Sequence, residues 1–249
     1  MRRLVVTILA LALLAPGCGG GDSKPTIKVS AAASLKTAFE NYAKHFDAAK
    51  VSYSFAGSDE LAAQIQQGVK PDDYAAANTK LPNDLYSKSL VKKPVEFATN
   101  TLVIALPDGS TKVKSIDDLA KPGITIAAGS PTVPIGSYTR KVLGGLPPAE
   151  AKAIERNIKS EEPDVAGIVG KVATGAVDAG FVYVTDVRGS SGKLVGIEIP
   201  ASLQPTVVYG ASVVNGAAHP SQAQEFIDGL LQGAGRQALA EAGFGPPPK

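Results

Sequence analysis

Short β-rich runs that alternate with helical stripes are the feature that most constrains the fold of this chain. The first run, Thr26–Ala32, precedes apolar residues at helical spacing across residues 34–45. Further β-rich runs lie at 51–56, 73–77, 100–106, 124–128, 179–184, 194–199 and 207–214, and further helical stripes at 59–67, 138–143, 149–158, 165–173, 222–231 and 237–242. This alternation favours an α/β fold with mostly parallel sheets flanked by helices. Two such sheets side by side would leave a ligand cleft at the carboxyl ends of their strands.

The first residues have the layout of an export signal rather than of a folded segment. Arg2 and Arg3 form a short basic region, and an apolar run over residues 4–15 follows it. A run of about a dozen residues is shorter than the roughly 20 that a membrane-spanning helix needs. The pattern therefore predicts a secretory signal peptide and an exported protein.

Cys18 is the only cysteine, so an internal disulfide is impossible. One interpretation is a chance thiol in a discarded peptide, and the other is a lipobox cysteine that is acylated after cleavage. Ala15 occupies a lipobox position where Leu, Val or Ile is usual. The Gly-rich residues 19–25 read as a flexible tether to a membrane. We expect a lipoprotein signal peptide over residues 1–18, with lipid attached at Cys18.

Charge and motif content favour a binding protein over most other classes. The chain has 25 basic and 23 acidic residues and no Trp, which argues against a nucleic-acid partner. Only His45 and His219 could serve as histidine bases. The sequence contains none of the usual motifs of enzymes and metal sites: no nucleophile elbow, no phosphate-binding loop, no dinucleotide fingerprint and no metal-ligand cluster. We predict no enzymatic activity. A secreted α/β hydrolase or transferase, and a sensory or adhesion module, remain alternatives from other classes.

Five strand-to-helix junctions carry small residues and hydroxyls. They lie at residues 31–35, 55–62, 129–136, 162–165 and 180–183. A serine at such a junction can simply cap its helix. Small neighbours also let a ligand approach the free N–H groups of the first turn, where the helix dipole attracts anions. The junctions therefore predict an anion site.

Several of these junctions match motifs of a known family. They read Ala-Ala-Ala-Ser-Leu at 31–35, Phe-Ala-Gly-Ser-x-x-Leu-Ala at 55–62, Val-Pro-x-Gly at 133–136, and Asp-Val at 164–165, where the Val lies eighteen residues before Tyr183. With these motifs the chain resembles the periplasmic molybdate-binding proteins of ABC importers, which have the type 2 periplasmic-binding-protein fold. The resemblance covers nearly all of residues 26–245.

The resemblance implies a two-lobed, monomeric binding protein that closes by hinge motion and delivers its ligand to a permease and its ATPase. Lobe I would comprise residues 26–100 plus 209–249, and lobe II residues 101–208. The crossover strands near 100–105 and 205–209 are the hinge candidates. No cofactor is implied, since molybdenum would be bound as the oxyanion and not coordinated by side chains.

The resemblance also implies the ligand set. Ser34 and Ser58 would each donate through hydroxyl and backbone N–H, Ile135 and Val165 through backbone N–H, and Tyr183 through its phenol. A site made only of donors suits a fully deprotonated dianion such as molybdate or tungstate, because preorganised dipoles can hold its charge.

The anion itself stays open at this point. Sulfate or another small anion is the alternative, because tetrahedral dianions differ mainly in size. Asp59 and Glu60 directly follow Ser58 and would compete with an anion unless their side chains point to solvent. We expect them to do so.

Overall fold

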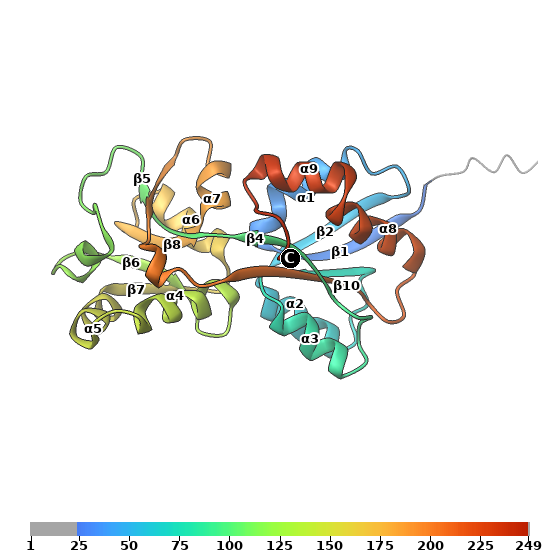
Figure 1. The fold of residues 1–249 in the computed structure, drawn as a ribbon, viewed down its shortest axis with the longest axis horizontal. Helices are drawn as coiled ribbons and strands as arrows, with labels where there is room; N and C mark the ends of the chain where they lie inside the picture. Colours follow the sequence, from blue (N-terminus) through green and yellow to red (C-terminus); the bar gives the residue numbers. More distant parts are fainter. Residues whose placement is uncertain (1–23, 249) are drawn as a thin grey trace, which may run out of the picture.

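The computed structural model describes residues 24–248 and contains two β-sheets, each flanked by helices (Figure 1). The predicted signal peptide, its Cys18 and most of the tether lie outside the described residues. Within residues 24–248, no helix is both long enough and apolar enough to cross a bilayer.

The first sheet has the strand order β2-β1-β3-β10-β4. Its strands are β1 (Thr26–Ala32), β2 (Lys50–Ala56), β3 (Asp73–Ala76), β4 (Val95–Asn100) and β10 (Val207–Val213). β10 is antiparallel to both of its neighbours, while β1 is parallel to β2 and to β3. Four of the five strands thus run in one direction.

The second sheet repeats this arrangement with the order β7-β6-β8-β5-β9. Its strands are β5 (Leu102–Pro107), β6 (Ile126–Gly129), β7 (Ile158–Glu162), β8 (Ala179–Tyr183) and β9 (Leu194–Glu198). Only β5 runs against its neighbours. The prediction of an α/β fold with two mostly parallel sheets is confirmed.

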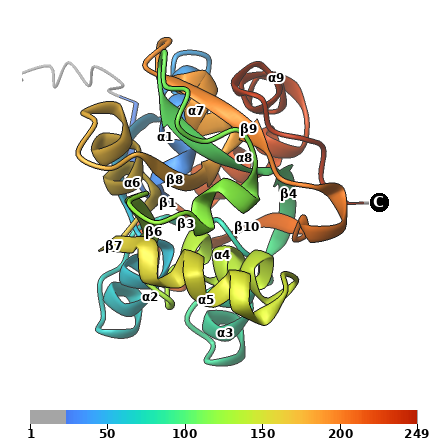
Figure 2. The same cartoon turned by 90° about the vertical axis from the view of Figure 1, so that its left-hand side faces the viewer.

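Helices cover both faces of each sheet. They are α1 (Lys36–Ala43), α2 (Ser58–Gln66), α3 (Lys80–Ser87), α4 (Pro134–Gly144), α5 (Pro148–Asn157), α6 (Val165–Ala173), α7 (Val184–Gly189), α8 (Pro220–Leu231) and α9 (Gly233–Ala242), with short 3-10 turns η1 (Ala33–Leu35), η2 (Ile116–Ala120) and η3 (Ala201–Leu203). Figures 1 and 2 both place α1, α7 and α9 on one side of the molecule and α2 to α5 on the other.

The chain crosses between the sheets twice. It leaves the first sheet at Thr101, between β4 and β5, and returns between β9 and β10. The two crossings are bonded to each other, because the Gln204 side chain accepts from the Leu102 N–H (3.3 Å) and donates to the Leu102 carbonyl (2.8 Å). The two crossings overlap the hinge candidates named from the sequence, 100–105 and 205–209. Hinge motion stays a prediction.

An aromatic cluster holds α1 and α8 against the first sheet. The Phe226 ring of α8 meets Phe39 edge-on at 5.4 Å and Phe46 at 5.3 Å between centroids, and Tyr42 lies at 4.7 Å. Edge-to-face pairs at these separations are favourable beyond the area that they bury. This packing fixes the start of α1, and with it the η1 turn that carries Ser34.

Four elements were not anticipated from the sequence. They are α3, β4, β7 and α7. β7 reads Ile-Lys-Ser-Glu-Glu and lies at the sheet edge, where polar residues are tolerated and no apolar run marks a strand. The helix expected over 149–158 ends at Asn157, because Ile158 already pairs with Ile126 of β6.

Candidate functional site

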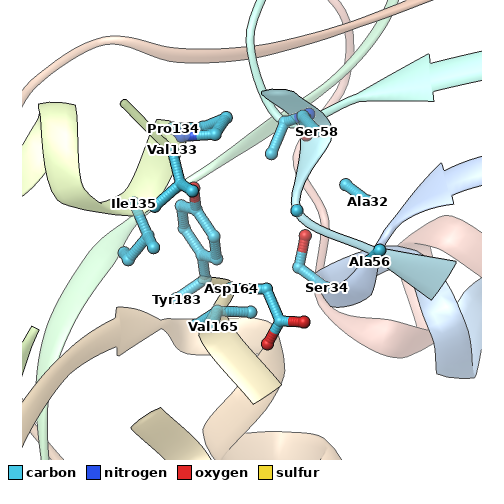
Figure 3. A pocket seen from close by; sticks show the side chains of 12 residues that line it. Ala32, Ser34, Ala56, Ser58, Val133, Pro134, Ile135, Asp164, Val165 and Tyr183 are labelled. Carbon is cyan, nitrogen blue, oxygen red and sulfur yellow. The ribbon is translucent and has the colours of Figure 1, made fainter. Parts of the chain in front are cut away.

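A small cavity lies where the carboxyl ends of the two sheets face each other (Figure 3). β1, β2 and β3 of the first sheet and β6, β7 and β8 of the second end at its wall. Its lining comprises Ala32, Ser34, Ala56, Gly57, Ser58, Ala77, Val133, Pro134, Ile135, Asp164, Val165 and Tyr183. All five residues predicted as oxyanion ligands are therefore brought together, from both lobes. Their role as ligands stays a prediction.

The two lobes touch at the edge of this cavity. A Cβ built on Gly57, at the end of the β2–α2 junction, would lie only 2.4 Å from the Pro163 carbonyl oxygen of the other lobe. A glycine is required at this close approach. The structure thus has its lobes closed over the cavity.

Ser34 lies in η1, where its hydroxyl is not used to cap a helix. The residue that precedes η1 is Ala32 and the one that precedes α1 is Leu35, and neither makes a side-chain cap. The sequence interpretation of Ser34 as a helix cap is therefore wrong. The buried Ser34 Oγ instead lies 2.9 Å from Tyr209 Oη of β10. Ser34 thus bonds to a distant strand and not to the N–H groups of its own helix.

Ser58 is the first residue of α2, and its side chain is likewise not a cap. Its Oγ accepts the Ala77 N–H at 3.1 Å, and its carbonyl accepts the Tyr74 hydroxyl at 2.7 Å. The Ser58 hydroxyl hydrogen has no acceptor among these contacts and remains available to a ligand. The same contacts fix the first turn of α2 against the end of β3.

Two helices of lobe II point their N-termini at the cavity. α4 begins at Pro134, which has no N–H, so Ile135 is the first residue that can donate. α6 begins at Val165. The N–H groups of a first turn have no partner within the helix and lie at the positive end of its dipole. Gly136 allows the tight start of α4, because a Cβ there would lie 1.9 Å from the Ser130 carbonyl oxygen.

Tyr183 ends β8 and supplies a buried phenol. The side chain is 1% exposed, and its Oη has no hydrogen-bond partner among the described residues. Burial raises the pKa of Tyr183 well above its usual value, so the phenol keeps its proton. An unpaired buried donor costs roughly 1–3 kcal/mol, which a bound acceptor would recover.

One carboxylate lines the cavity, and it is not one of the two that the sequence singled out. Asp164 accepts the Gly167 N–H at 3.0 Å as the N-cap of α6, and Figure 3 shows its oxygens directed away from the middle of the cavity. Asp59 and Glu60 lie outside the lining. Glu60 is exposed, as expected, and accepts from Gln64, whereas Asp59 is half-buried.

Sequence reasoning missed two residues that shape the site. Ala77 supplies the N–H to Ser58, and Tyr209 contacts Ser34. Ala77 follows a strand too weakly marked to be treated as a junction. Tyr209 lies inside an apolar strand 175 residues from Ser34, so no local pattern could connect the two.

Catalytic alternatives find no support near the cavity. His45 is exposed and His219 half-buried, and neither is part of the lining. In the part of the chain that the structure describes, no cluster of three or more His, Cys, Asp or Glu side chains could hold a metal ion.

The comparison with known proteins agrees with this geometry. Residues 27–245 match the model of a family described as bacterial extracellular solute-binding protein. The chain belongs to this family. This solute-binding protein is 35% identical to the molybdate-binding protein ModA of Mycobacterium tuberculosis over 98% of its length and 97% of the relative. It is 30% identical to the putative ABC transporter substrate-binding lipoprotein YvgL of Bacillus subtilis, over 97% and 96%.

Solved structures support the two-lobed fold. The periplasmic molybdate-binding protein of Azotobacter vinelandii superposes with a TM-score of 0.81 at 22% identity, covering 89% of this solute-binding protein and 100% of that chain. The sulfate-binding protein SubI of M. tuberculosis superposes with a TM-score of 0.76 at 18% identity, covering 89% and 87%. At these identities the likeness concerns the fold alone. The ligand has to be argued from the site.

Proposed function

We propose that this solute-binding protein captures molybdate, or the isosteric tungstate, in the interlobe cavity and delivers it to an ABC permease. The observation that carries the proposal is that the groups directed into the cavity are hydrogen-bond donors. Ser34, Ser58 and Tyr183 offer hydroxyl hydrogens, and two helix N-termini offer free N–H groups. The full-length relationship to ModA, a molybdate-binding protein, supports the choice of anion.

The chemistry of the wall favours a dianion without a proton. No Lys or Arg is among the residues that line the cavity, so the charge would be balanced by dipoles. Hydrogen bonds to a charged partner are worth roughly 1.5–3 kcal/mol each. Several acting together would give the low Kd that capture of a scarce ion requires. Hydrogen phosphate keeps a proton near pH 7 and needs an acceptor, whereas the one carboxylate in the wall caps α6 through one oxygen and turns both oxygens away from the middle of the cavity (Figure 3).

Isothermal titration with molybdate, tungstate, sulfate and phosphate tests the proposal. We expect tight binding of molybdate and tungstate and at least a tenfold preference over sulfate. Clear binding of sulfate with no heat from molybdate would replace the proposed ligand by the alternative one. Absence of binding for all four anions would refute an oxyanion function.

The same proposal includes export, a membrane anchor and a non-catalytic role for a monomer. The leader and Cys18 support the anchor, and YvgL, which is described as a lipoprotein, is a full-length relative. Metabolic labelling with a fatty acid tests it in the full chain: label should appear in the wild type and be lost in Cys18→Ala. Unlabelled wild-type protein in the soluble fraction would contradict the anchor.

A further inference from the structure

A chain of buried polar groups runs from the crossover segments to Ser34. Asn100, the last residue of β4, donates from Nδ2 to Tyr209 Oη at 3.3 Å, and Tyr209 Oη lies 2.9 Å from Ser34 Oγ. Tyr209 is 0% exposed. These hydrogen bonds therefore connect β4 and β10, the two strands of the first sheet next to the crossings, with Ser34 in the cavity wall.

The orientation of the Asn100 amide is fixed by its neighbours. Its Oδ1 accepts the Thr101 N–H at 2.9 Å, and a backbone N–H can only donate. The amide nitrogen must therefore be the atom that faces Thr185 Oγ1, at 2.9 Å, and Tyr209 Oη. The backbone of the crossover thus sets the first hydrogen-bond direction in the chain.

This direction propagates to the cavity. The –NH₂ group of Asn100 cannot accept, so the buried Tyr209 hydroxyl needs another acceptor for its hydrogen. Ser34 Oγ is the hydrogen-bond partner of Tyr209 Oη that can accept it. With its oxygen receiving the tyrosine hydrogen, Ser34 directs its own hydrogen elsewhere, and its side chain points into the cavity in Figure 3. The Ala77 N–H acts on Ser58 in the same way.

We propose that Tyr209 and Asn100 are positioning residues that orient the Ser34 hydroxyl so that its hydrogen points to the bound anion. This rests on the proposed oxyanion function and adds a specificity device to it. Because one lone pair of the Ser34 oxygen accepts from Tyr209 and its hydrogen is turned toward the ligand, the hydroxyl meets the anion as a donor, which favours fully deprotonated oxyanions over protonated ones such as hydrogen phosphate. Because Asn100 and Tyr209 belong to the crossover strands, the polarity of the site is set by the hinge region.

A double-mutant cycle with Ser34→Ala and Tyr209→Phe tests the inference. Phe keeps the ring that packs on Phe97, Tyr183 and Phe244 and removes only the hydroxyl. We expect Tyr209→Phe to raise the molybdate Kd about tenfold in the wild-type background, and to have no further effect when Ser34 is already Ala. The phosphate Kd should rise less, so that discrimination between the two anions narrows.

The matched control is Tyr53→Phe. Tyr53 also lies in the first sheet and donates to the Phe39 carbonyl at 2.7 Å, but it is not part of the cavity wall. The Tyr53→Phe variant should leave the molybdate Kd unchanged while lowering the melting temperature by about as much as Tyr209→Phe does. If Tyr209→Phe fails to fold, Asn100→Leu provides a second test, because it removes the donor and keeps the Tyr209–Ser34 pair. It should raise the Kd about threefold, again only when Ser34 is present.

The outcomes separate the inference from the function beneath it. Wild-type protein that binds none of the oxyanions refutes the proposed function and the inference with it. Wild-type binding of molybdate combined with an equal effect of Tyr209→Phe in both backgrounds refutes positioning through Ser34 and leaves the function standing. An unchanged molybdate Kd in Tyr209→Phe likewise refutes positioning through Ser34 and leaves the function standing.

Discussion

Gly57→Ala is the sharpest test of lobe closure, because it penalises only the closed state. Gly57 has φ −59° and ψ 136°, a conformation that alanine adopts without strain. The added methyl would lie 2.4 Å from the Pro163 carbonyl oxygen of the opposite lobe. Within the first lobe the methyl would meet the Asp59 Oδ1 at 3.0 Å, and a side chain can move aside. The first lobe should therefore fold as before, while the cavity can no longer close completely.

The size of the effect follows from the distances. Real Cβ contacts are essentially never shorter than 3.0 Å and are ordinary from 3.4 Å, so the lobes must separate by about 0.6–1.0 Å at this point. A hydrogen bond of about 2.9 Å across the cavity would then stretch to roughly 3.5–3.9 Å, where it ceases to count as one. The loss of one bond to a charged ligand costs roughly 1.5–3 kcal/mol, which corresponds to a roughly 10- to 100-fold higher Kd.

Isothermal titration with molybdate measures the Kd, and thermal unfolding without ligand measures the stability of the variant. Gly170→Ala is the matched control, since a Cβ at this α6 residue would meet nothing within 4 Å. It should bind as the wild type and be slightly more stable, by about 0.5–1 kcal/mol. A Gly57→Ala variant with wild-type affinity would refute the reasoning that binding requires the closed contact with Pro163.

Two further predictions concern the wall of the cavity, and a third concerns Asp186 in the first turn of α7. Ser34→Ala and Ser58→Ala should each weaken molybdate binding by about 1.5–3 kcal/mol in titration calorimetry, and unchanged affinity in both would contradict the site assignment. Tyr183→Phe should weaken binding by a similar amount yet not lower the melting temperature, because its hydroxyl has no partner to lose; a large loss of stability would show that the hydroxyl is bonded within the protein. Burial raises the pKa of Asp186 from 3.8 to about 7. The folded state therefore holds a proton that the unfolded chain releases between about pH 4 and 7, and stability should fall as the pH rises through this window. Asp186→Asn should reduce the change of melting temperature with pH between pH 5 and 8. Equal pH dependence in the variant and the wild type would contradict the role of Asp186.

Much of the fold could be predicted from local patterns. The strand Thr26–Ala32 was located to the residue, and most other elements to within a few residues, because apolar periodicity reports directly which face of an element is buried. The prediction failed where burial is partial. β7 is a polar edge strand and α3 contains Pro82, so neither carries the pattern of its element.

The candidate site divides in a similar way. The junction residues Ser34, Ser58, Ile135, Val165 and Tyr183 were predicted because each motif lies within a few consecutive residues, where a strand ends and a helix begins. All five line one cavity. Their ligand roles stay predictions until an anion is bound.

The sequence by itself determined the α/β class and the residues at each junction, since these depend on neighbours along the chain. Only the tertiary structure decided how the hydroxyls are used. Ser34 faces Tyr209 and Ser58 accepts from Ala77, where local rules also allowed helix caps. Buried polar groups must find partners, and when strands distant in sequence meet, the partner that satisfies a hydroxyl need not be the one nearest along the chain.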